Sequence, residues 1–257
     1  MSAATLTSDK FVKKDALRRI ISDIKEIKKN PLTAHGIYYE HDETDMLKGR
    51  ALIIGPADTP YADGFYLFTF QFPANYPHAP PKVEFCTSDG VTRFNPNLYR
   101  TGKVCLSILN TWKGEPWSGC QTISSVLLAL CTVLNDEPLL NEPGITKSHR
   151  DYEAYNEIIR YKNIEVAIFG MLRSVGANEV GANEVGANAV GANATLDTPC
   201  ALDANEFAIF GDIMRKYFLE NKEKIRQRVL AGEQKEYTIG VYKMTVLTDY
   251  KKLLMKF

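Results

Sequence analysis

The sequence predicts an α+β fold: an N-terminal helix, a four-stranded antiparallel meander, a loop that carries a cysteine, and C-terminal helices followed by a helical extension. Apolar residues recur at helical spacing before residue 30 and again after residue 122. Between residues 36 and 85, four short runs rich in aromatic and β-branched residues are separated by glycine and proline. Strands that follow one another through short turns pair as a meander.

The composition is that of an ordinary soluble globular chain. The 257 residues are 45% hydrophobic and 24% charged, and this length allows one large or two modest domains. The formal net charge is zero, so no overall field attracts nucleic acid or an anionic membrane. No apolar run approaches the roughly 20 residues of a membrane span, and the first ten residues lack the pattern of a secretory signal. We therefore expect neither nucleic acid nor a membrane as a partner.

The chain has five cysteines, at positions 86, 105, 120, 131 and 200, and no Cys-x-x-Cys pair. This odd number argues against a disulfide framework and a zinc knuckle, and it favours a reducing compartment. We expect a protein of the cytoplasm, the nucleus or both, with no metal and no cofactor. Cys131 lies in an apolar helical run and is expected in the core. Only Cys105 has a distinctive sequence context.

The first element is an amphipathic helix over residues 9 to 29, with Ser8 or Asp9 expected at its N-cap and Asn30-Pro31 at its end. Its apolar face is formed by Leu17, Ile20, Ile21, Ile24 and Ile27. The opposite face is basic and carries Lys13, Lys14, Arg18, Arg19, Lys25 and Lys28. The residues alone favour a solvated helix face, with a binding surface as the alternative.

Four strands are expected next, over residues 36–41, 49–54, 64–72 and 82–85. In the third strand every second residue is aromatic, which places four rings on one face: Tyr66, Phe68, Phe70 and Phe72. Four prolines follow between Pro73 and Pro81, and each reduces the conformational entropy of the unfolded chain. The resulting rigid loop is either a platform for a partner or a stiff turn.

Helical spacing returns over residues 123–134 and 150–173. Residues 175–194 are four copies of a pentapeptide, VGANE twice and VGANA twice. Because a five-residue period matches neither a helical nor a strand face, and four copies are too few for a β-helix, we interpret this segment as a linker. A helix over 203–231 and a last element over 242–257 follow. The predicted division is a core over 8–173, a linker over 174–200 and an extension over 201–257.

The sequence around Cys105 is typical of a nucleophilic site. A turn-rich loop with Asn97 precedes the cysteine by eight residues, Pro96 and Gly102 favour tight turns, and a short apolar run follows. A loop could therefore bring the Asn97 amide back toward the thiol. A carboxamide beside a nucleophilic thiol can stabilise an oxyanion.

The segment from Arg93 to Trp117 resembles the active-site segment of the ubiquitin-conjugating enzymes. That family has His-Pro-Asn, then about eight residues, a Gly-x-(Val/Ile)-Cys-Leu run and a tryptophan. The chain has Gly102-Lys103-Val104-Cys105-Leu106, but asparagine at position 95 and extra residues around Trp112. Both departures are shared by a subgroup whose loop reads Phe-Asn-Pro-Asn. The turn over 55–65 and the proline-rich loop over 72–81 also resemble the family.

The resemblance implies the ubiquitin-conjugating fold and a conjugating activity. Cys105 would accept ubiquitin or a ubiquitin-like modifier as a thioester from an activating enzyme, and a lysine amine would then receive it, usually with a ligase. Asn97 would stabilise the oxyanion of that second step. Acidic groups must assist the lysine, and three are candidates: Asp136, Glu137 and Glu142. No Gly-rich phosphate loop occurs, so ATP use would belong to the partner.

The resemblance also implies partner surfaces on a chain that we expect to be monomeric. Lys13, Lys14 and Arg18 are candidates for contacts with the activating enzyme. The candidates for contacts with a ligase are Pro77, His78, Trp117 and Gly119. The residues do not indicate which modifier, ligase or substrate is used.

Two other functions compete with conjugation. A cysteine hydrolase needs a histidine base beside Cys105, and none of the four histidines lies in a hydrolase-like motif. A catalytically silent binding module of the same fold is the alternative, although silent relatives lose the cysteine that this chain retains.

Overall fold

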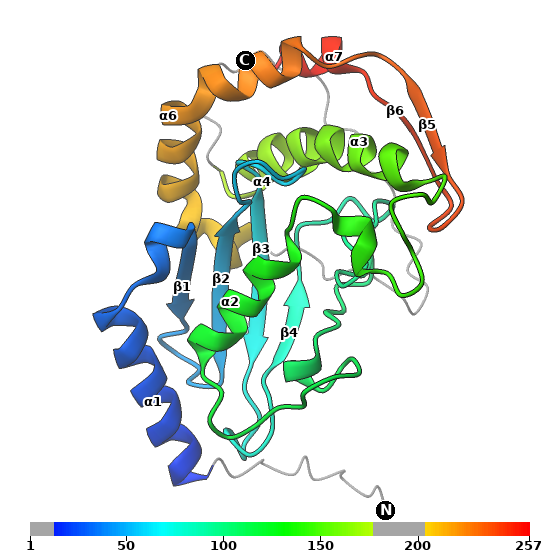
Figure 1. The fold of residues 1–257 in the computed structure, drawn as a ribbon. Coiled ribbons are helices and arrows are strands. Elements are labelled where there is room, and N and C mark those ends of the chain that lie inside the picture. Colours follow the sequence, from blue (N-terminus) through cyan, green and yellow to red (C-terminus); the bar gives the residue numbers. More distant parts are fainter. Residues whose placement is uncertain (1–12, 177–203) are drawn as a thin grey trace, which may run out of the picture.

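The computed structural model describes residues 13–176 and 204–257 (Figure 1). Its main sheet has the strand order β1-β2-β3-β4, and every neighbouring pair is antiparallel. The core elements are α1 (Lys14–Lys29), β1 (Ile37–His41), β2 (Lys48–Ile54), β3 (Phe65–Gln71), β4 (Lys82–Phe85), α2 (Ile123–Val133) and α3 (Tyr152–Lys162). The expected meander is therefore present, with strand ends within one residue of the prediction.

The extension is less purely helical than expected. It contains α5 (Ala204–Phe207), α6 (Gly211–Leu230), β5 (Glu236–Ile239), β6 (Met244–Leu247) and α7 (Tyr250–Leu254). β5 and β6 form an antiparallel hairpin that the sequence reading missed. Figure 1 shows this hairpin beside α3, with α6 and α7 across the end of the sheet. The hairpin strands are only four residues long, which is too short for a clear alternation of apolar and polar residues.

α1 buries Ala16, Ile20 and Ile27 and ends at Lys29, with Asn30 at its C-cap ahead of Pro31 as predicted. Ile21, which the apolar period places on the same face, is 41% exposed, so this part of the prediction is wrong. Its first helical residue is Lys14, and Lys13 is extended at the N-cap. The candidate caps Ser8 and Asp9 lie outside the described residues. The helix therefore begins later than the expected residue 9.

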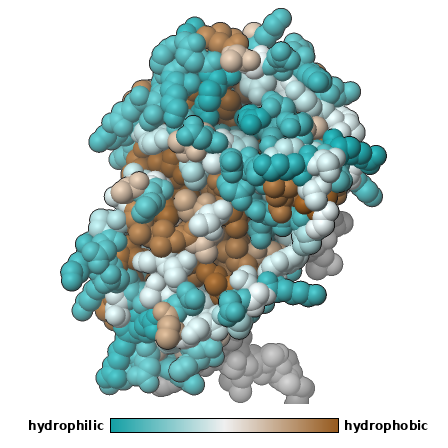
Figure 2. All heavy atoms as spheres, in the orientation of Figure 1, coloured by the Kyte–Doolittle hydropathy of each residue, from teal (hydrophilic) through white to brown (hydrophobic). Residues whose placement is uncertain are grey.

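The main core lies on the face of the sheet that α2 covers. Tyr66, Phe68 and Phe70 of β3 point into it, as the alternation predicts, together with Ile123 and Leu127 of α2. A capping box starts α2, because Thr122 Oγ1 accepts from the Ser125 amide (3.2 Å) and Ser125 Oγ accepts from the Thr122 amide (2.9 Å). In Figure 2 hydrophobic residues gather over the middle of this face.

The opposite face of the sheet is buried as well. Phe65 and Leu67 of β3 pack there against Phe207, Phe210 and Met214 of the extension. The alternation of aromatic residues in β3 predicts the burial of only the face that α2 covers. The second face is apolar because the extension covers it.

The expected helix over 150–173 is one helical run with a change of type. α3 continues into a π-helix (Asn163–Gly170) and then α4 (Met171–Ser174). The side chain of Asn163 accepts from the Tyr66 hydroxyl (2.6 Å) and donates to the Ala62 carbonyl (2.8 Å). A Cβ on Gly64 would lie 1.9 Å from Asn163 Oδ1, so this approach requires glycine.

The predicted linker begins too early. Val175, the first residue of the repeat, is buried in the second core after the end of α4. Residues 177–203, which hold the rest of the repeat, lie outside the described residues.

A buried carboxylate joins α6 to the turn between β2 and β3. Asp63 is 2% exposed; it accepts from the Tyr217 hydroxyl (2.7 Å) and pairs with Arg228 (2.7 Å). Lys224 adds a longer ion pair at 3.4 Å. This cluster fixes the extension on the core. Among the residues that the structure describes, no helix has the length and apolar character needed to span a membrane.

Candidate functional site

The structure brings Cys105 and Asn97 together. The Cys105 amide donates to the Asn97 carbonyl (2.8 Å), and Asn97 Nδ2 donates to the Cys105 carbonyl (2.7 Å). The side-chain amide of Asn97 therefore holds the Cys105 backbone, whereas the sequence predicts that it faces an oxyanion. Because an amide NH₂ carries two hydrogens, one donor remains for a reacting group. Cys105 itself is only 2% exposed.

Asn95, the residue that departs from the family pattern, is fully buried. Its Nδ2 donates to the Tyr61 hydroxyl oxygen (2.8 Å) and to the Val133 carbonyl (2.7 Å), and its Oδ1 accepts from the Asn97 amide (2.8 Å). The Tyr61 hydroxyl in turn donates to the Phe94 carbonyl (2.7 Å). Asparagine at position 95 thus orients the backbone that carries Asn97.

A chain of amides connects this loop to the segment after α2. Asn141 donates to Asn95 Oδ1 (3.4 Å) and to the Val133 carbonyl (3.2 Å), and it accepts from Asn135 (3.0 Å). Three side-chain amides therefore link residues 95 and 135–141. Sequence reasoning missed this network, although each of the two segments carries two asparagines.

Thr111 fixes the other side of the cysteine. Its hydroxyl oxygen accepts from the Leu106 amide (2.9 Å) and donates to the Val104 carbonyl (2.8 Å). Thr111 and Trp112 belong to the segment with extra residues, and Trp112 is 45% exposed. The segment is thus tied to the backbone on both sides of Cys105.

The three acidic candidates differ in their surroundings. Glu137 pairs with Lys147 and accepts from the Tyr152 hydroxyl (2.6 Å), and Glu142 accepts from the Tyr242 hydroxyl (2.5 Å). Asp136 is exposed and makes no hydrogen bond or ion pair within the described residues. Of the three candidates, only Asp136 has a carboxylate without a hydrogen-bond or ion-pair partner among the described residues.

The partners of Glu137 also set its charge. The hydrogen bonds from Lys147 and from Tyr152 lower the pKa of Glu137, and the same bond to Glu137 raises the pKa of Tyr152 to about 12. Glu137 is therefore an anion at neutral pH, and its negative charge is balanced by Lys147.

The four candidate ligase residues lie on one surface. Trp117 Nε1 donates to the Pro77 carbonyl (2.7 Å), and a Cβ on Gly119 would lie 3.7 Å from the same oxygen. His78, the next residue after Pro77, is exposed. The proline-rich loop and the loop after Cys105 thus form a common face.

The basic face of α1 is smaller than expected. Lys13, Lys14 and Arg18 are exposed, and Arg18 makes a surface ion pair with Asp15 (3.3 Å). Arg19 is committed elsewhere: it pairs with buried Asp23 (2.8 Å) and donates to the carbonyls of Gly119 (2.8 Å) and Gln121 (2.6 Å). The inclusion of Arg19 in the free basic face was therefore wrong.

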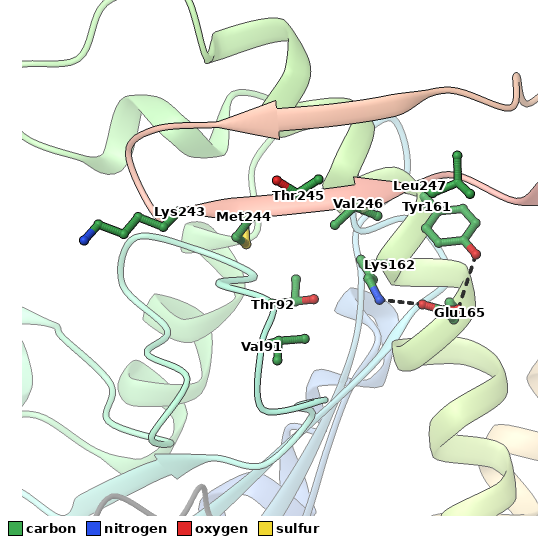
Figure 3. A pocket seen from close by; sticks show the side chains of 10 residues that line it. All are labelled: Val91, Thr92, Tyr161, Lys162, Glu165, Lys243, Met244, Thr245, Val246 and Leu247. Carbon is green, nitrogen blue, oxygen red and sulfur yellow. Dashed lines mark hydrogen bonds and ion pairs between the residues drawn. The ribbon is translucent and has the colours of Figure 1, made fainter. Parts of the chain in front are cut away.

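A cavity of about 310 Å³ lies between β6, α3 and the loop after β4 (Figure 3). Figure 3 shows Lys162 and Glu165 pointing toward each other within it. Lys162 pairs with Glu165 (2.7 Å) and with Asp89 (3.3 Å), so its charge is balanced locally. Cys105 and Asn97 do not line this cavity. In the described part of the chain, no three His, Cys, Asp or Glu side chains are placed to hold a metal ion.

Comparison with known proteins identifies the family of the chain. The family model described as ubiquitin-conjugating enzyme matches residues 19–163, which is more than half of the chain. Ubiquitin-conjugating enzyme E2 Z from Homo sapiens is 47% identical over 174 residues, covering 65% of this chain and 49% of that protein. The solved structure of human ubiquitin-conjugating enzyme E2 G1 matches with a TM-score of 0.41 and 31% identity, covering 47% of this chain and 94% of that one.

A second type of relative is much larger. The dual E2 ubiquitin-conjugating enzyme/E3 ubiquitin-protein ligase BIRC6 from Homo sapiens is 42% identical over 159 residues, which cover 55% of this chain and 3% of that protein. The Phe-Asn-Pro-Asn loop predicts similarity to E2 Z and to the conjugating domain of BIRC6, and this prediction is confirmed. The chain spans about half the length of the E2 Z relatives. The matched family model covers the sheet, the Cys105 loop and α2, and the chain belongs to the ubiquitin-conjugating enzyme family.

Proposed function

We propose that this chain is an active conjugating enzyme that carries ubiquitin or a ubiquitin-like modifier as a thioester on Cys105. The observation that supports it most directly is the pairing of Asn97 with Cys105, in which Asn97 Nδ2 lies 2.7 Å from the Cys105 carbonyl oxygen. This contact keeps a carboxamide next to the cysteine. An uncommitted carboxylate on Asp136, in the segment tied to the same loop by amides, adds to the support.

The chemistry consists of two acyl transfers. In the first, the Cys105 thiolate attacks the thioester carbon held by the activating enzyme. A carbon–sulfur bond to Cys105 forms, and the bond to the activating enzyme's sulfur breaks. In the second, a neutral lysine amine attacks the same carbon, the carbon–nitrogen bond forms and the Cys105 sulfur leaves. Sulfur suits this task because it both attacks and leaves readily.

The second step needs help from the protein. The lysine has an ordinary pKa of about 10.4, so it must lose a proton before or during attack, and in this proposal the Asp136 carboxylate accepts it. The remaining hydrogen of Asn97 Nδ2 would donate to the oxyanion. One such donor lowers the activation barrier by about 2.7–4 kcal/mol.

The partner surfaces follow from the exposed residues. We assign the activating enzyme to the N-terminal end of α1, where Lys13, Lys14 and Arg18 are exposed. We assign a ligase to the face that joins Pro77 and His78 with Trp117.

The alternative is a binding module that never forms a thioester. The burial of Cys105, at 2% exposure, favours it, because a thiol must be reached before it can react. The retention of the cysteine, the Asn97 contact and the free Asp136 favour catalysis.

A charging assay decides between the two. The chain is incubated with ATP and with activating enzymes for ubiquitin and for ubiquitin-like modifiers, and adducts are resolved with and without reductant. We expect a reducible adduct that Cys105→Ala abolishes. Matched controls are Cys120→Ala, which is exposed, and Cys131→Ala, which is half-buried, and both should charge normally. Normal charging of Cys105→Ala would contradict the assignment, and a folded wild type that no modifier charges would establish the binding module.

A further inference from the structure

The turn of the β5–β6 hairpin rests against the segment that carries the candidate site. Arg100 Nη2 donates to the Tyr242 carbonyl (2.7 Å), and the Arg93 amide donates to Met244 Sδ (3.2 Å). Asp151, which is buried, holds the turn in place: its carboxylate accepts hydrogen bonds from the backbone amides of Gly240 (2.8 Å) and Val241 (2.9 Å). Residues more than 140 positions apart are thus brought into contact beside the cysteine loop.

Arg93 transmits this contact to Asn97. Its guanidinium donates to the carbonyls of Asn95 (3.0 Å) and Pro96 (2.6 Å), the two residues before Asn97. The Arg93 guanidinium carbon lies 5.3 Å from the centroid of the Tyr242 ring and 3.4 Å from that of the Tyr99 ring. Tyr242 therefore packs on the side chain that supports the Asn97 backbone.

The same tyrosine reaches the acidic segment. Its hydroxyl donates to Glu142 Oε2 (2.5 Å), and its ring packs against Tyr155 at a centroid distance of 5.8 Å. Burial and the bond to Glu142 raise the pKa of Tyr242, so the hydroxyl keeps its proton at neutral pH and remains a donor. One side chain of the extension thus touches both segments that flank the candidate site.

We propose that Tyr242 is a positioning residue for the lysine-transfer step, which sets the Asn97 loop against the segment from Asp136 to Glu142. The inference rests on the proposed function. Tyr242 acts through Arg93 and Glu142 and does not touch the thioester. It makes the C-terminal extension part of the machinery for acyl transfer to lysine.

This role predicts a selective defect. Tyr242→Phe keeps the ring on Arg93 and Tyr155 but loses the bond to Glu142. We expect discharge of the charged enzyme to free lysine to slow by about tenfold, because small errors in the placement of reacting groups are costly. The lysine concentration at half-maximal rate should stay unchanged. Charging should stay close to wild type, because Tyr242→Phe leaves both hydrogen bonds between Asn97 and Cys105 in place.

Tyr237→Phe is the matched control. Tyr237 lies in β5 of the same hairpin, and its hydroxyl makes no hydrogen bond within the described residues. The control should discharge like wild type. Melting temperatures of both variants are measured, and rates are compared well below the lower one.

A double-mutant cycle with Glu142→Ala tests the proposed link, since it removes the same bond from the other side. If Tyr242 acts through Glu142, the double variant should be no slower than the slower single variant. A product of the two single effects, a Tyr242→Phe rate equal to the control, or equal losses in charging and discharge would each overturn the inference. If wild type fails to charge at all, the proposed function itself fails, so the two failures are distinguishable.

Discussion

Asn97 and Cys105 are joined by two reciprocal hydrogen bonds, one from the Asn97 side-chain amide to the Cys105 carbonyl (2.7 Å) and one from the Cys105 amide to the Asn97 carbonyl (2.8 Å). The Asn97 side chain therefore holds the Cys105 backbone with one hydrogen of its amide, and the second amide hydrogen remains available to a reacting group. The two roles are separable by experiment, because holding the loop affects both transfers and oxyanion stabilisation affects one.

Asn97→Ala should charge nearly normally and discharge slowly to lysine. The oxyanion that the second hydrogen would stabilise arises at lysine attack, and the loss of one such donor typically slows a reaction by about 100- to 1000-fold, so we expect a defect of at least about tenfold. Single-turnover discharge of the purified thioester measures the effect. Equal defects in charging and discharge would show that the bond to the Cys105 carbonyl is the only role of Asn97.

Asp136→Asn and Glu137→Gln should have different effects. Asp136 is exposed and uncommitted, so its loss should slow discharge by roughly tenfold or more, as expected for a general base, with no change in melting temperature. Glu137 is bound to Lys147 and Tyr152, so Glu137→Gln should lower the melting temperature and slow discharge less. Discharge rates and thermal melts of both variants give the comparison, and the reverse order would assign the lysine-side role to Glu137.

Ligase binding should be atypical. Family members that use common ligases carry a bulky apolar residue after Tyr-Pro, whereas this chain has exposed His78 there and Gly119 in place of a proline. Because apolar anchors contribute much of the binding free energy of an interface, wild type should bind a panel of RING-type ligases weakly. His78→Phe should bind more tightly in a titration, and His35→Phe, at another exposed histidine, should not. Tight binding of wild type across the panel would refute this expectation.

The buried ion pair of Asp63 should carry much of the attachment of α6. Asp63→Asn keeps the size and the left-handed backbone preference of the residue but leaves Arg228 without its carboxylate. We expect a loss of about 3 kcal/mol in the free energy of unfolding, because the remaining charge is uncompensated. Lys224→Met removes the more exposed partner, 54% exposed, and should cost about 0–1 kcal/mol. Urea denaturation measures both, and equal losses would exclude a special role for the Arg228 pair.

The pentapeptide repeat should be dispensable after its first valine. Deletion of residues 180–194 should leave folding and charging almost unchanged, since the entropy of loop closure depends only logarithmically on length. Deletion of residues 175–194 also removes Val175, which is buried in the second core, and should cost about 1.5–3 kcal/mol more. Thermal melts compare the two. A large loss from the shorter deletion, together with resistance of the segment to proteolysis, would overturn the linker interpretation.

The sequence by itself determined the features that depend on neighbours along the chain. The alternation of Tyr66, Phe68 and Phe70 predicted a strand with one buried face, the apolar period after Thr122 predicted α2, and the turn residues before Cys105 predicted its approach to Asn97. Each of these depends on a backbone period or on a turn within about ten residues. Local sterics and side-chain chemistry suffice for them.

The tertiary structure alone decided which polar groups are free. Arg19 resembles its basic neighbours in the sequence but is committed to Asp23, and Glu142 resembles Asp136 but is bound to Tyr242. The second buried face of the sheet likewise depends on Phe207 and Phe210, which follow the repeat. Such contacts join residues far apart in the sequence, so no local period records them. They form because a buried polar group needs a partner and an apolar face needs a cover, and only the packed chain determines which residues supply these.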